Sequence, residues 1–346
     1  MKNTVAFILL AMALFAGLCA GSLTSKHFLA KLGEPVGYWR KFDWMVNTGK
    51  PYDTLLLGTS RVEDGIDSHC LDRENAKWGK KTLTINLANS SLNVLEVREL
   101  MKRTLIEKHG TIKRVIYEPD FLAHYTLTEN KITPRATGYM SLSHAWELYR
   151  YLQEGSFPAG DPDYARAHTQ RILINDIIEK TYRHITHVGT FWYLLKQYGT
   201  DNVWDSRHGD GFVQLDPNKE KIPDFAQARK EQLAEYQSNT FHLNPNQVSM
   251  IEELSAMVKQ YGAKLYLFLP PGFLWDQAQF TAMSRDRPFS ADIAVMDFAV
   301  PTDDTLYKED NFLDGHHLTS KGVALMCPLV SRKLCEFEKD CHPDNR

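Results

Sequence analysis

Three side chains that could together activate a nucleophile stand near opposite ends of this 346-residue chain. Ser60 follows an apolar run at residues 54–57 and a glycine at position 58, whereas Asp314 and His317 stand three residues apart near the other end. A serine becomes an effective nucleophile when a base takes its proton, and the base works best when a third group fixes its tautomer. The residues therefore predict a Ser-His-Asp triad of Ser60, His317 and Asp314, with His316 as a competing base.

The elements that would have to bring these side chains together follow an alternating pattern. Short apolar runs at residues 54–58, 81–87, 114–120, 263–269 and 294–297 predict strands, and apolar residues at helical spacing predict helices at 94–108, 246–261 and 319–337. Strands that are apolar on both faces and alternate with helices are typical of a parallel sheet covered on both sides. The predicted fold class is therefore α/β, a three-layer α/β/α arrangement around a parallel sheet.

Ligands of such sheets bind beyond the carboxyl ends of the strands. The residues that follow predicted strands there, or stand beside the triad, are candidates for oxyanion and substrate binding: Arg61, Asn89, Ser91, Glu118 and His316. Two interpretations of Arg61 stay open, because it could bind an anionic substrate group or pair with Glu63 or Asp64.

Residues 121–240 interrupt the α/β rhythm and predict a mainly helical insertion folded over the sheet. Within it, His184 and His187 have a spacing that metal ligands can use, but no third ligand stands at a matching distance, so packing is the favoured interpretation. No metal and no cofactor are expected. Cys335 and Cys341 allow either a small disulfide or two free thiols.

The first 24 residues predict a membrane anchor or a signal segment. Residues 5–23 carry no charge and would span roughly 28 Å as a helix, close to the hydrocarbon thickness of a bilayer. An uncleaved anchor is favoured over a cleaved signal, and in both cases residues 25–346 are predicted to be exported. The net charge of −3 and the lack of a Lys/Arg run argue against a nucleic-acid partner.

Two motifs resemble those of a known superfamily. Gly58-Thr59-Ser60-Arg61 resembles the first block of the SGNH (GDSL-like) hydrolases, and Asp314-Gly315-His316-His317 resembles their last block. With the anchor, Pro270-Pro271 and the His317-Leu318-Thr319 tail, the chain resembles the membrane-anchored branch that accompanies membrane-bound O-acyltransferases. The resemblance covers residues 50–120 and 240–335, and it implies an SGNH-hydrolase-like, flavodoxin-like fold with a Ser60-Asp314-His317 triad.

This resemblance also implies a function and a location. The expected protein is a single-pass protein of the bacterial inner membrane with its soluble domain in the periplasm. It would act as an O-acyltransferase or esterase on acyl esters, with acetyl as the expected group, of a cell-surface polysaccharide, beside a membrane-bound O-acyltransferase partner. The third block of the superfamily, Gly-x-Asn-Asp, is absent, and the loop matching the second block has Asn89-Ser90-Ser91 where a glycine is usual. A catalytically silent scaffold subunit of a polysaccharide acylation or export complex is therefore the alternative.

Overall fold

The computed structural model describes residues 38–90, 92, 94–119, 211–212, 222, 224–238, 242–243, 245–273, 277–338 and 341, with isolated positions elsewhere. The two motifs that carry the candidate catalytic residues both fall within these ranges. The predicted anchor lies almost entirely outside them, as do His184, His187 and most of the predicted insertion. Among the described residues there is no helix with the length and apolar character needed to cross a membrane.

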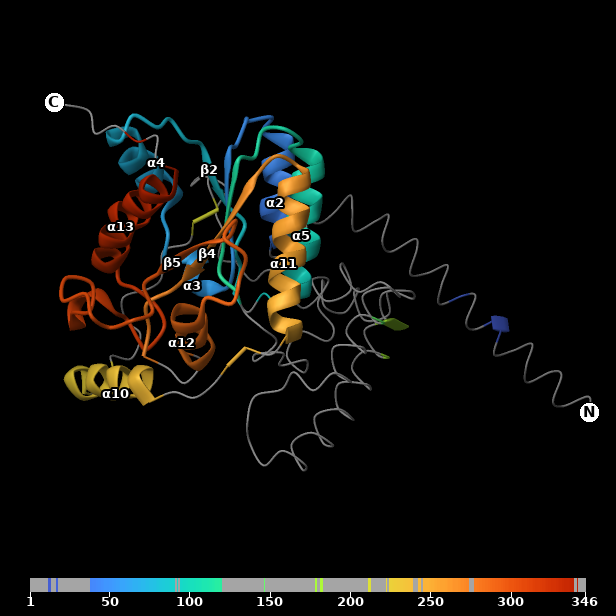
Figure 1. Cartoon of the computed structure of the whole chain (residues 1–346). Coiled ribbons are helices and arrows are strands. Elements are labelled where there is room, and N and C mark those ends of the chain that lie inside the picture. Colours follow the sequence, from blue (N-terminus) through green and yellow to red (C-terminus); the bar gives the residue numbers. More distant parts are fainter. Residues whose placement is uncertain are drawn as a thin grey trace, which may run out of the picture. The chain divides into compact units, whose positions relative to one another are not determined.

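The body is built on a five-stranded sheet in which every neighbouring pair of strands is parallel. The strand order is β2-β1-β3-β4-β5 (Figure 1). The strands are β1 (Thr54–Leu57), β2 (Thr84–Asn86), β3 (Arg114–Tyr117), β4 (Lys264–Leu269) and β5 (Ala294–Asp297). Both faces of these short strands are buried except at their ends, as expected for a sheet with helices on each side. The predicted α/β class is therefore confirmed.

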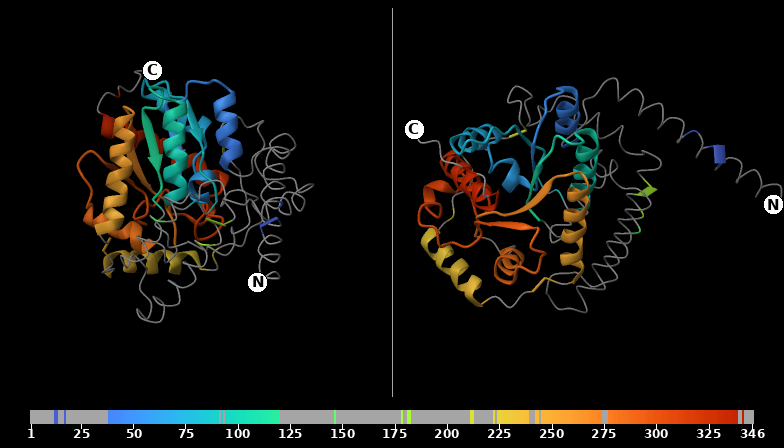
Figure 2. Two further views of the ribbon diagram at one scale, coloured as in Figure 1. Left: turned by 90° about the vertical axis from the view of Figure 1, so that its right-hand side faces the viewer. Right: turned by 45° about the horizontal axis from the view of Figure 1, so that its top comes forward.

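Two groups of helices cover the sheet (Figures 1 and 2). On one face lie α2 (Tyr38–Asn47), α5 (Val94–Glu107) and α11 (Pro245–Gln260), and on the other lie α4 (Ser68–Lys77) and α13 (Ser320–Glu338). The remaining described elements are α3 (Ser60–Glu63), α10 (Phe225–Ser238), α12 (Gln277–Asp286) and the 3-10 helix η2 (Glu309–Asn311). Of these, α10 contacts α12, and η2 contacts α13.

The three helices predicted from apolar spacing end within one residue of the observed α5, α11 and α13. The second strand is shorter than its apolar run, and α4 was not predicted. Its sequence, SHCLDRENAK, offers few apolar residues to reveal a helical period. The helix is held instead by its N-cap, where the Asp67 side chain accepts from the Cys70 N–H, and by packing on α13.

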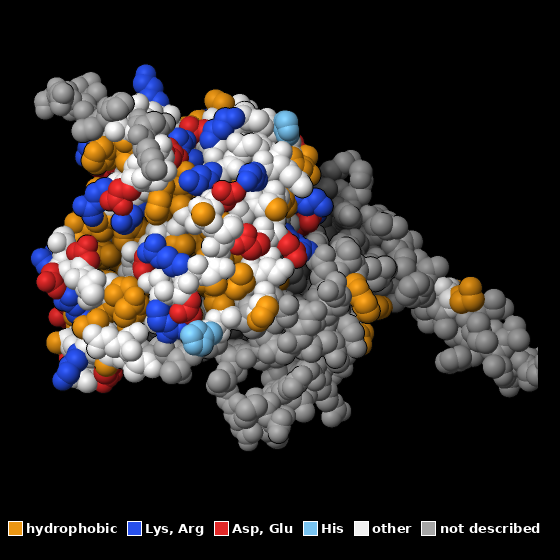
Figure 3. All heavy atoms as spheres, in the orientation of Figure 1, with side chains coloured by type: hydrophobic (Ala, Val, Ile, Leu, Met, Phe, Trp, Pro, Cys, Tyr) orange, Lys and Arg blue, Asp and Glu red, His pale blue; other side chains and the backbone are white. Residues whose placement is uncertain are grey.

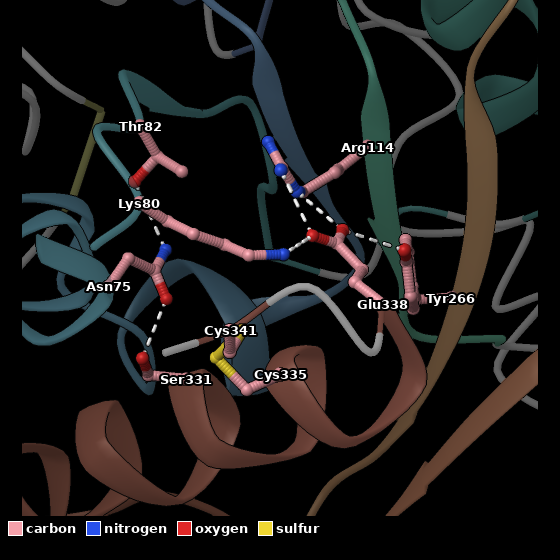
Figure 4. The surroundings of a disulfide bond; sticks show 9 residues. All are labelled: Asn75, Lys80, Thr82, Arg114, Tyr266, Ser331, Cys335, Glu338 and Cys341. Carbon is pink, nitrogen blue, oxygen red and sulfur yellow. Dashed lines mark hydrogen bonds and ion pairs between the residues drawn. A yellow bond between two sulfur atoms is a disulfide. The ribbon is translucent and has the colours of Figure 1, made fainter. Parts of the chain in front are cut away.

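A cluster of charged side chains joins the end of α13 to the edge of the sheet where the strands begin. The Glu338 carboxylate, at the end of α13, accepts two hydrogen bonds from Arg114 at 2.6 and 3.0 Å and one from the Tyr266 hydroxyl at 2.8 Å (Figure 4). Lys80 is a further ion-pair partner. Burial by itself would raise the pKa of Glu338, but the Arg114 and Lys80 contacts outweigh it and lower the pKa from 4.5 to about 2.

This lowered pKa predicts an acid-sensitive contribution to stability. Because the folded-state pKa of Glu338 lies below the unfolded value, the contribution is complete above pH 4.5 and is lost as the pH falls toward 2. It amounts to about 3 kcal/mol. Glu338→Gln should remove it, so that urea unfolding shows a flatter dependence of stability on pH in this window. Glu336→Gln, at an exposed position of the same helix, is the control and should keep the wild-type slope.

Four cysteines pair within the body. Cys335 and Cys341 form the disulfide that the sequence had left open, at the end of α13 (Figure 4). Cys70 and Cys327 form a second disulfide, with 5.9 Å between their Cα atoms, which joins α4 to α13. This second pairing spans 257 residues of sequence and was not predicted, because only the packing of α4 on α13 brings the two thiols together.

The surface of the described body mixes charges of both signs. On the face seen in Figure 3, Lys and Arg side chains are interspersed with Asp and Glu. This face of the described residues therefore shows no extended basic patch of the kind that binds nucleic acid.

Candidate active site

Ser60 is presented by a tight connection from β1 into α3. The buried strand ends at Leu57, two residues turn the chain, and Ser60 is the first residue of the short helix. Thr59 caps this helix, because its side-chain oxygen accepts a hydrogen bond of 3.3 Å from the Arg61 N–H. The connection places a half-buried serine at the carboxyl end of β1, an interior strand, at the edge where parallel sheets bind their ligands.

Gly58 makes this turn possible. Its φ of 155° is a conformation that L side chains rarely adopt, and a Cβ there would lie 2.7 Å from both Glu118 Cβ and Val62 Cγ2. The backbone therefore approaches its neighbours more closely than any residue with a side chain allows.

Replacing Gly58 by alanine should destabilise the body by about 3 kcal/mol, since it combines backbone strain with overpacking. The test is the midpoint of urea unfolding of the full-length protein. Gly110→Ala is the matched control: its φ is +77°, but no atom lies within 4 Å of the added Cβ, so only the strain applies. A Gly58→Ala variant no less stable than the control would contradict this account of the turn.

The Ser60 hydroxyl lies within hydrogen-bonding distance of an imidazole from the far end of the chain. The distance from Ser60 Oγ to His317 Nε2 is 2.9 Å, and His317 Nδ1 lies 2.8 Å from Asp314 Oδ2. A carboxylate can only accept hydrogen bonds, so Nδ1 carries the hydrogen and Nε2 has the free lone pair facing Ser60. The three predicted side chains thus lie together in the order that proton transfer from serine to histidine requires.

Asp314 and His317 lie in a short loop that is held by its own hydrogen bonds. Asp314 Oδ1 accepts the backbone N–H groups of His316 and His317, both at 2.8 Å, so the carboxylate organises its own loop. The Leu313 N–H donates to the His317 carbonyl, and Phe312 pairs with Leu318 in an antiparallel bridge. The base is therefore carried on a closed turn rather than on a free loop.

This turn is also tied to the segment after β4. The Phe273 N–H donates to the Gly315 carbonyl at 2.8 Å. The nearby Gly272 N–H donates to the Tyr307 hydroxyl at 3.4 Å, and that hydroxyl donates in turn to the carbonyls of Phe298 and Ala299. The loops after β4 and β5 thus buttress the turn that carries His317.

Asp314 stays ionised over the whole physiological range. Its partial burial would raise the pKa of the carboxyl, but the hydrogen bond with His317 and the backbone N–H of His316 outweigh burial and hold the pKa well below its usual range. A permanently charged Asp314 both selects the tautomer of His317 and stabilises the imidazolium that forms when the base takes a proton.

Two residues predicted to bind substrate make contacts within the turn that carries Ser60. Glu118, at the end of β3, has no exposed surface, and Arg61 is 7% exposed. They form an ion pair, with 2.5 Å between Arg61 Nε and Glu118 Oε1, so Arg61 pairs with neither Glu63 nor Asp64 as the sequence had suggested. Glu118 also accepts the Thr59 N–H at 2.8 Å. Their contacts support a role in holding the turn, and their binding of substrate stays a prediction.

The other residues predicted to bind the oxyanion or the substrate are His316, Asn89 and Ser91. The ring of His316 stands edge-on to that of His317, with 5.9 Å between centroids, and it is His317 rather than His316 that reaches Ser60. Asn89 lies beside the turn, since its N–H donates to the Gly58 carbonyl at 3.2 Å. Ser91 lies outside the described residues.

The loop that carries Asn89 has its backbone N–H groups occupied. The four consecutive donors of residues 87–90 are bonded, in order, to the Leu56 carbonyl, Asn86 Oδ1, the Gly58 carbonyl and Glu63 Oε2. None of these four is available to a developing oxyanion. The Ser60 N–H, in contrast, has no acceptor among the described residues.

Sequence reasoning missed the ion pair of Lys41 and Glu63, whose side chains form hydrogen bonds with residues of this same loop. Glu63 stands three residues after Ser60, and a carboxylate one helical turn from a candidate nucleophile was a usable signal. Nothing in the sequence around Lys41 pointed to it.

Other candidate sites are weaker. A cavity of about 170 Å³ is lined by residues that include Asp64, Asp67, Arg73 and Phe212, but it includes none of the triad. Within the described ranges, no group of His, Cys, Asp and Glu has the arrangement of a metal site. No family model and no curated protein matches the chain, so the geometry of the described residues carries the functional argument.

Proposed function

We propose that this protein is an exported, membrane-anchored SGNH-type O-acyltransferase or esterase acting on acyl esters, with acetyl as the expected group, of a cell-surface polysaccharide. The observation that carries the proposal is the hydrogen-bonded series from Ser60 through His317 to Asp314. The strand order 2-1-3-4-5 supports a flavodoxin-like doubly wound fold, in which ligands bind at the edge where Ser60 stands.

The proposed reaction has two steps. Ser60 Oγ attacks the carbonyl carbon of the acyl donor while its proton passes to His317 Nε2, and collapse of the tetrahedral intermediate expels the donor alcohol, protonated by His317. A sugar hydroxyl or water then attacks the acyl-enzyme, with His317 again as base. The products are the acylated sugar or the free acid, together with the regenerated serine.

Location outside the cytoplasm is supported by the two disulfides, because such bonds persist in oxidising compartments. The uncharged residues 5–23 support an anchor in the inner membrane, with the soluble domain in the periplasm. An exported transferase has no access to cytoplasmic acyl-CoA, so the proposal includes a membrane-bound O-acyltransferase that supplies the acyl group.

A catalytically silent scaffold is the second candidate, and one observation favours it. The backbone N–H groups of residues 87–90 are all bonded within the protein, so these four positions offer no main-chain donor to an oxyanion. Each lost donor costs roughly 3–4 kcal/mol of transition-state stabilisation, and a site without compensation would be slow.

The experiment that separates the two candidates is detection of the acyl-enzyme. Full-length protein is mixed with p-nitrophenyl acetate, quenched in acid, and examined by intact-mass and peptide-mapping spectrometry. The enzyme proposal expects one acetyl group on the peptide that contains Ser60, released when fresh acceptor is added. Absence of acetylation, with phenol release at the uncatalysed rate, would favour the scaffold. Acceleration of phenol release by a polysaccharide hydroxyl would indicate a transferase rather than an esterase.

A further inference from the structure

Lys41 and Glu63 form an ion pair in the interior of the body. Lys41 Nζ lies 2.6 Å from Glu63 Oε1, and the two side chains are 1% and 6% exposed. Taking two charges out of water is costly, and an apolar pair of similar size frequently gives an equally stable protein. The charge of this pair is therefore not explained by stability alone, and its further hydrogen bonds show what it holds.

Both partners hold the loop at residues 88–90. Lys41 Nζ donates to the Ala88 carbonyl at 2.7 Å. Glu63 Oε2 accepts the Ser90 N–H at 2.9 Å and the Ser90 hydroxyl at 3.2 Å, and Glu63 Oε1 accepts Asn89 Nδ2 at 3.3 Å. The pair thus contacts each of residues 88, 89 and 90.

The same pair links the loop to the nucleophile. Glu63 is the last residue of α3, the helix that Ser60 begins. Asn86, at the end of β2, adds a second link, because its Nδ2 donates to the carbonyls of Val62 and Ile66 at 2.9 and 3.1 Å. A shift of Glu63 would therefore move Asn89 relative to Ser60.

Within residues 87–90, the Asn89 side chain can still offer a hydrogen-bond donor. All four backbone N–H groups of residues 87–90 are occupied, but the Asn89 amide has two hydrogens and, among the described residues, one hydrogen bond, at the long distance of 3.3 Å from Glu63. Asn89 is also partly exposed, unlike the buried Ala88 before it. An amide hydrogen is a suitable oxyanion donor when it is held in place before the reaction.

We propose that the buried Lys41–Glu63 pair is a positioning device that orients the Asn89 side-chain amide as the second oxyanion donor beside the Ser60 N–H. This inference rests on the proposed acyl transfer at Ser60. Asn89 would contact the reacting oxygen, whereas Lys41 and Glu63 act through the loop.

The test compares Glu63→Gln, Asn89→Ala and the double variant with the wild type, using p-nitrophenyl acetate and its thionoester analogue. Asn89→Ala should lower kcat for the oxygen ester by about 10²–10³-fold, the effect of one lost oxyanion donor. Glu63→Gln should lower it by about 10²-fold with KM little changed, because the amide is misplaced. Both variants should reduce the oxygen-ester preference over the thionoester, whose sulfur is a weak acceptor and gains less from the donor.

The double variant distinguishes positioning from general damage. If Glu63 acts through Asn89, the double variant should be no slower than Asn89→Ala alone, whereas independent effects would multiply. Glu74→Gln is the control, since Glu74 pairs with Lys77 on the surface of α4, and it should change neither kcat nor the ester preference. A Glu63→Gln variant with lower kcat for both esters to the same extent would overturn the proposal.

Amide hydrogen exchange separates failure of this inference from failure of the proposed function. Glu63→Gln should accelerate exchange at the Ser90 N–H but not at the Leu87 N–H, which bonds to the Leu56 carbonyl beside the sheet. Unchanged exchange at Ser90 would overturn the positioning role whatever the enzyme does. If Glu63→Gln accelerates exchange at the Ser90 N–H as expected, but the wild type shows no Ser60-dependent turnover, the proposed function is overturned. The role of Asn89 as a donor is then overturned with it.

Glu63→Gln leaves Lys41 buried without its counter-charge, so it could fail to fold. In that case Lys41→Met combined with Glu63→Met removes both charges together, a change that buried pairs frequently tolerate. This neutral variant should have a wild-type unfolding midpoint to within a few degrees, yet show the same loss of kcat and of ester preference. Retention of wild-type kcat in the folded neutral variant would overturn the proposal.

Discussion

Ser60→Ala should lower the turnover of an acyl ester by about 10⁶-fold, essentially to the uncatalysed rate. The reason is geometric: the hydroxyl at 2.9 Å from His317 Nε2 is the group placed to form the acyl-enzyme. The measurement is kcat for p-nitrophenyl acetate with full-length protein, together with the unfolding midpoint. Because the serine is half-buried and its hydroxyl, among the described residues, bonds only to His317, stability should change little.

The matched control for this prediction is Ser238→Ala. Ser238 lies at the exposed end of α10, where its hydroxyl donates to the Ala234 carbonyl. It should turn over ester at the wild-type rate. Equal rates for wild type and Ser60→Ala would remove the enzyme proposal and leave the scaffold.

Asp314→Asn should lower kcat by about 10⁴-fold while the loop keeps its shape. The asparagine oxygen can still accept the N–H groups of His316 and His317, which Asp314 Oδ1 accepts in the native protein. Its NH₂ group, however, would face His317 Nδ1 and donate to it. The ring would then carry its hydrogen on Nε2 and could no longer accept the proton of Ser60.

This explanation makes a spectroscopic prediction beside the kinetic one. ¹⁵N NMR of the His317 ring at a pH where it is neutral should show the hydrogen on Nδ1 in the wild type and on Nε2 in Asp314→Asn. Asp310→Asn, at a nearby exposed position that pairs with Lys321, should alter neither kcat nor the tautomer. A large loss of kcat with an unchanged tautomer would mean that Asp314 acts by charge alone.

The two substitutions should not be additive. Once Ser60 is absent, the orientation of His317 has no nucleophile to serve, so combining Ser60→Ala with Asp314→Asn should cost no more than Ser60→Ala. A further loss in the double variant would point to a second pathway that uses His317 without Ser60.

Much of the sheet and of the triad was determined by the sequence itself. The short apolar runs predicted all five strands, and helical spacing predicted α5, α11 and α13, because both patterns arise between residues one to four positions apart. The contact of Asp314 with His317 is equally local, since an Asp-x-x-His turn brings the two side chains together within one loop. Ser60 and His317 are 257 residues apart, and their pairing was predicted from their chemistry and from the resemblance to a superfamily that has both motifs.

The partners of buried charges were decided only by the tertiary structure. Arg61 pairs with Glu118 on β3 rather than with a near neighbour in sequence, and Glu63 pairs with Lys41 from α2. The same holds for the Cys70–Cys327 disulfide, which depends on how α4 lies against α13. Sequence spacing cannot reveal such contacts, because they depend on which strands are neighbours, on their register and on the angle at which each helix packs.

The proposal needs a proton to pass from a hydroxyl on α3 to an imidazole just ahead of α13, with a charged carboxylate behind that imidazole. The sequence named those three groups from the position of Ser60 after a strand, the spacing of Asp314 and His317, and the resemblance of both motifs to one superfamily. The conformation of residues 87–90 was decided by long-range packing, since three of their four backbone N–H groups bond to Leu56, Gly58 and Glu63, which are far away in sequence.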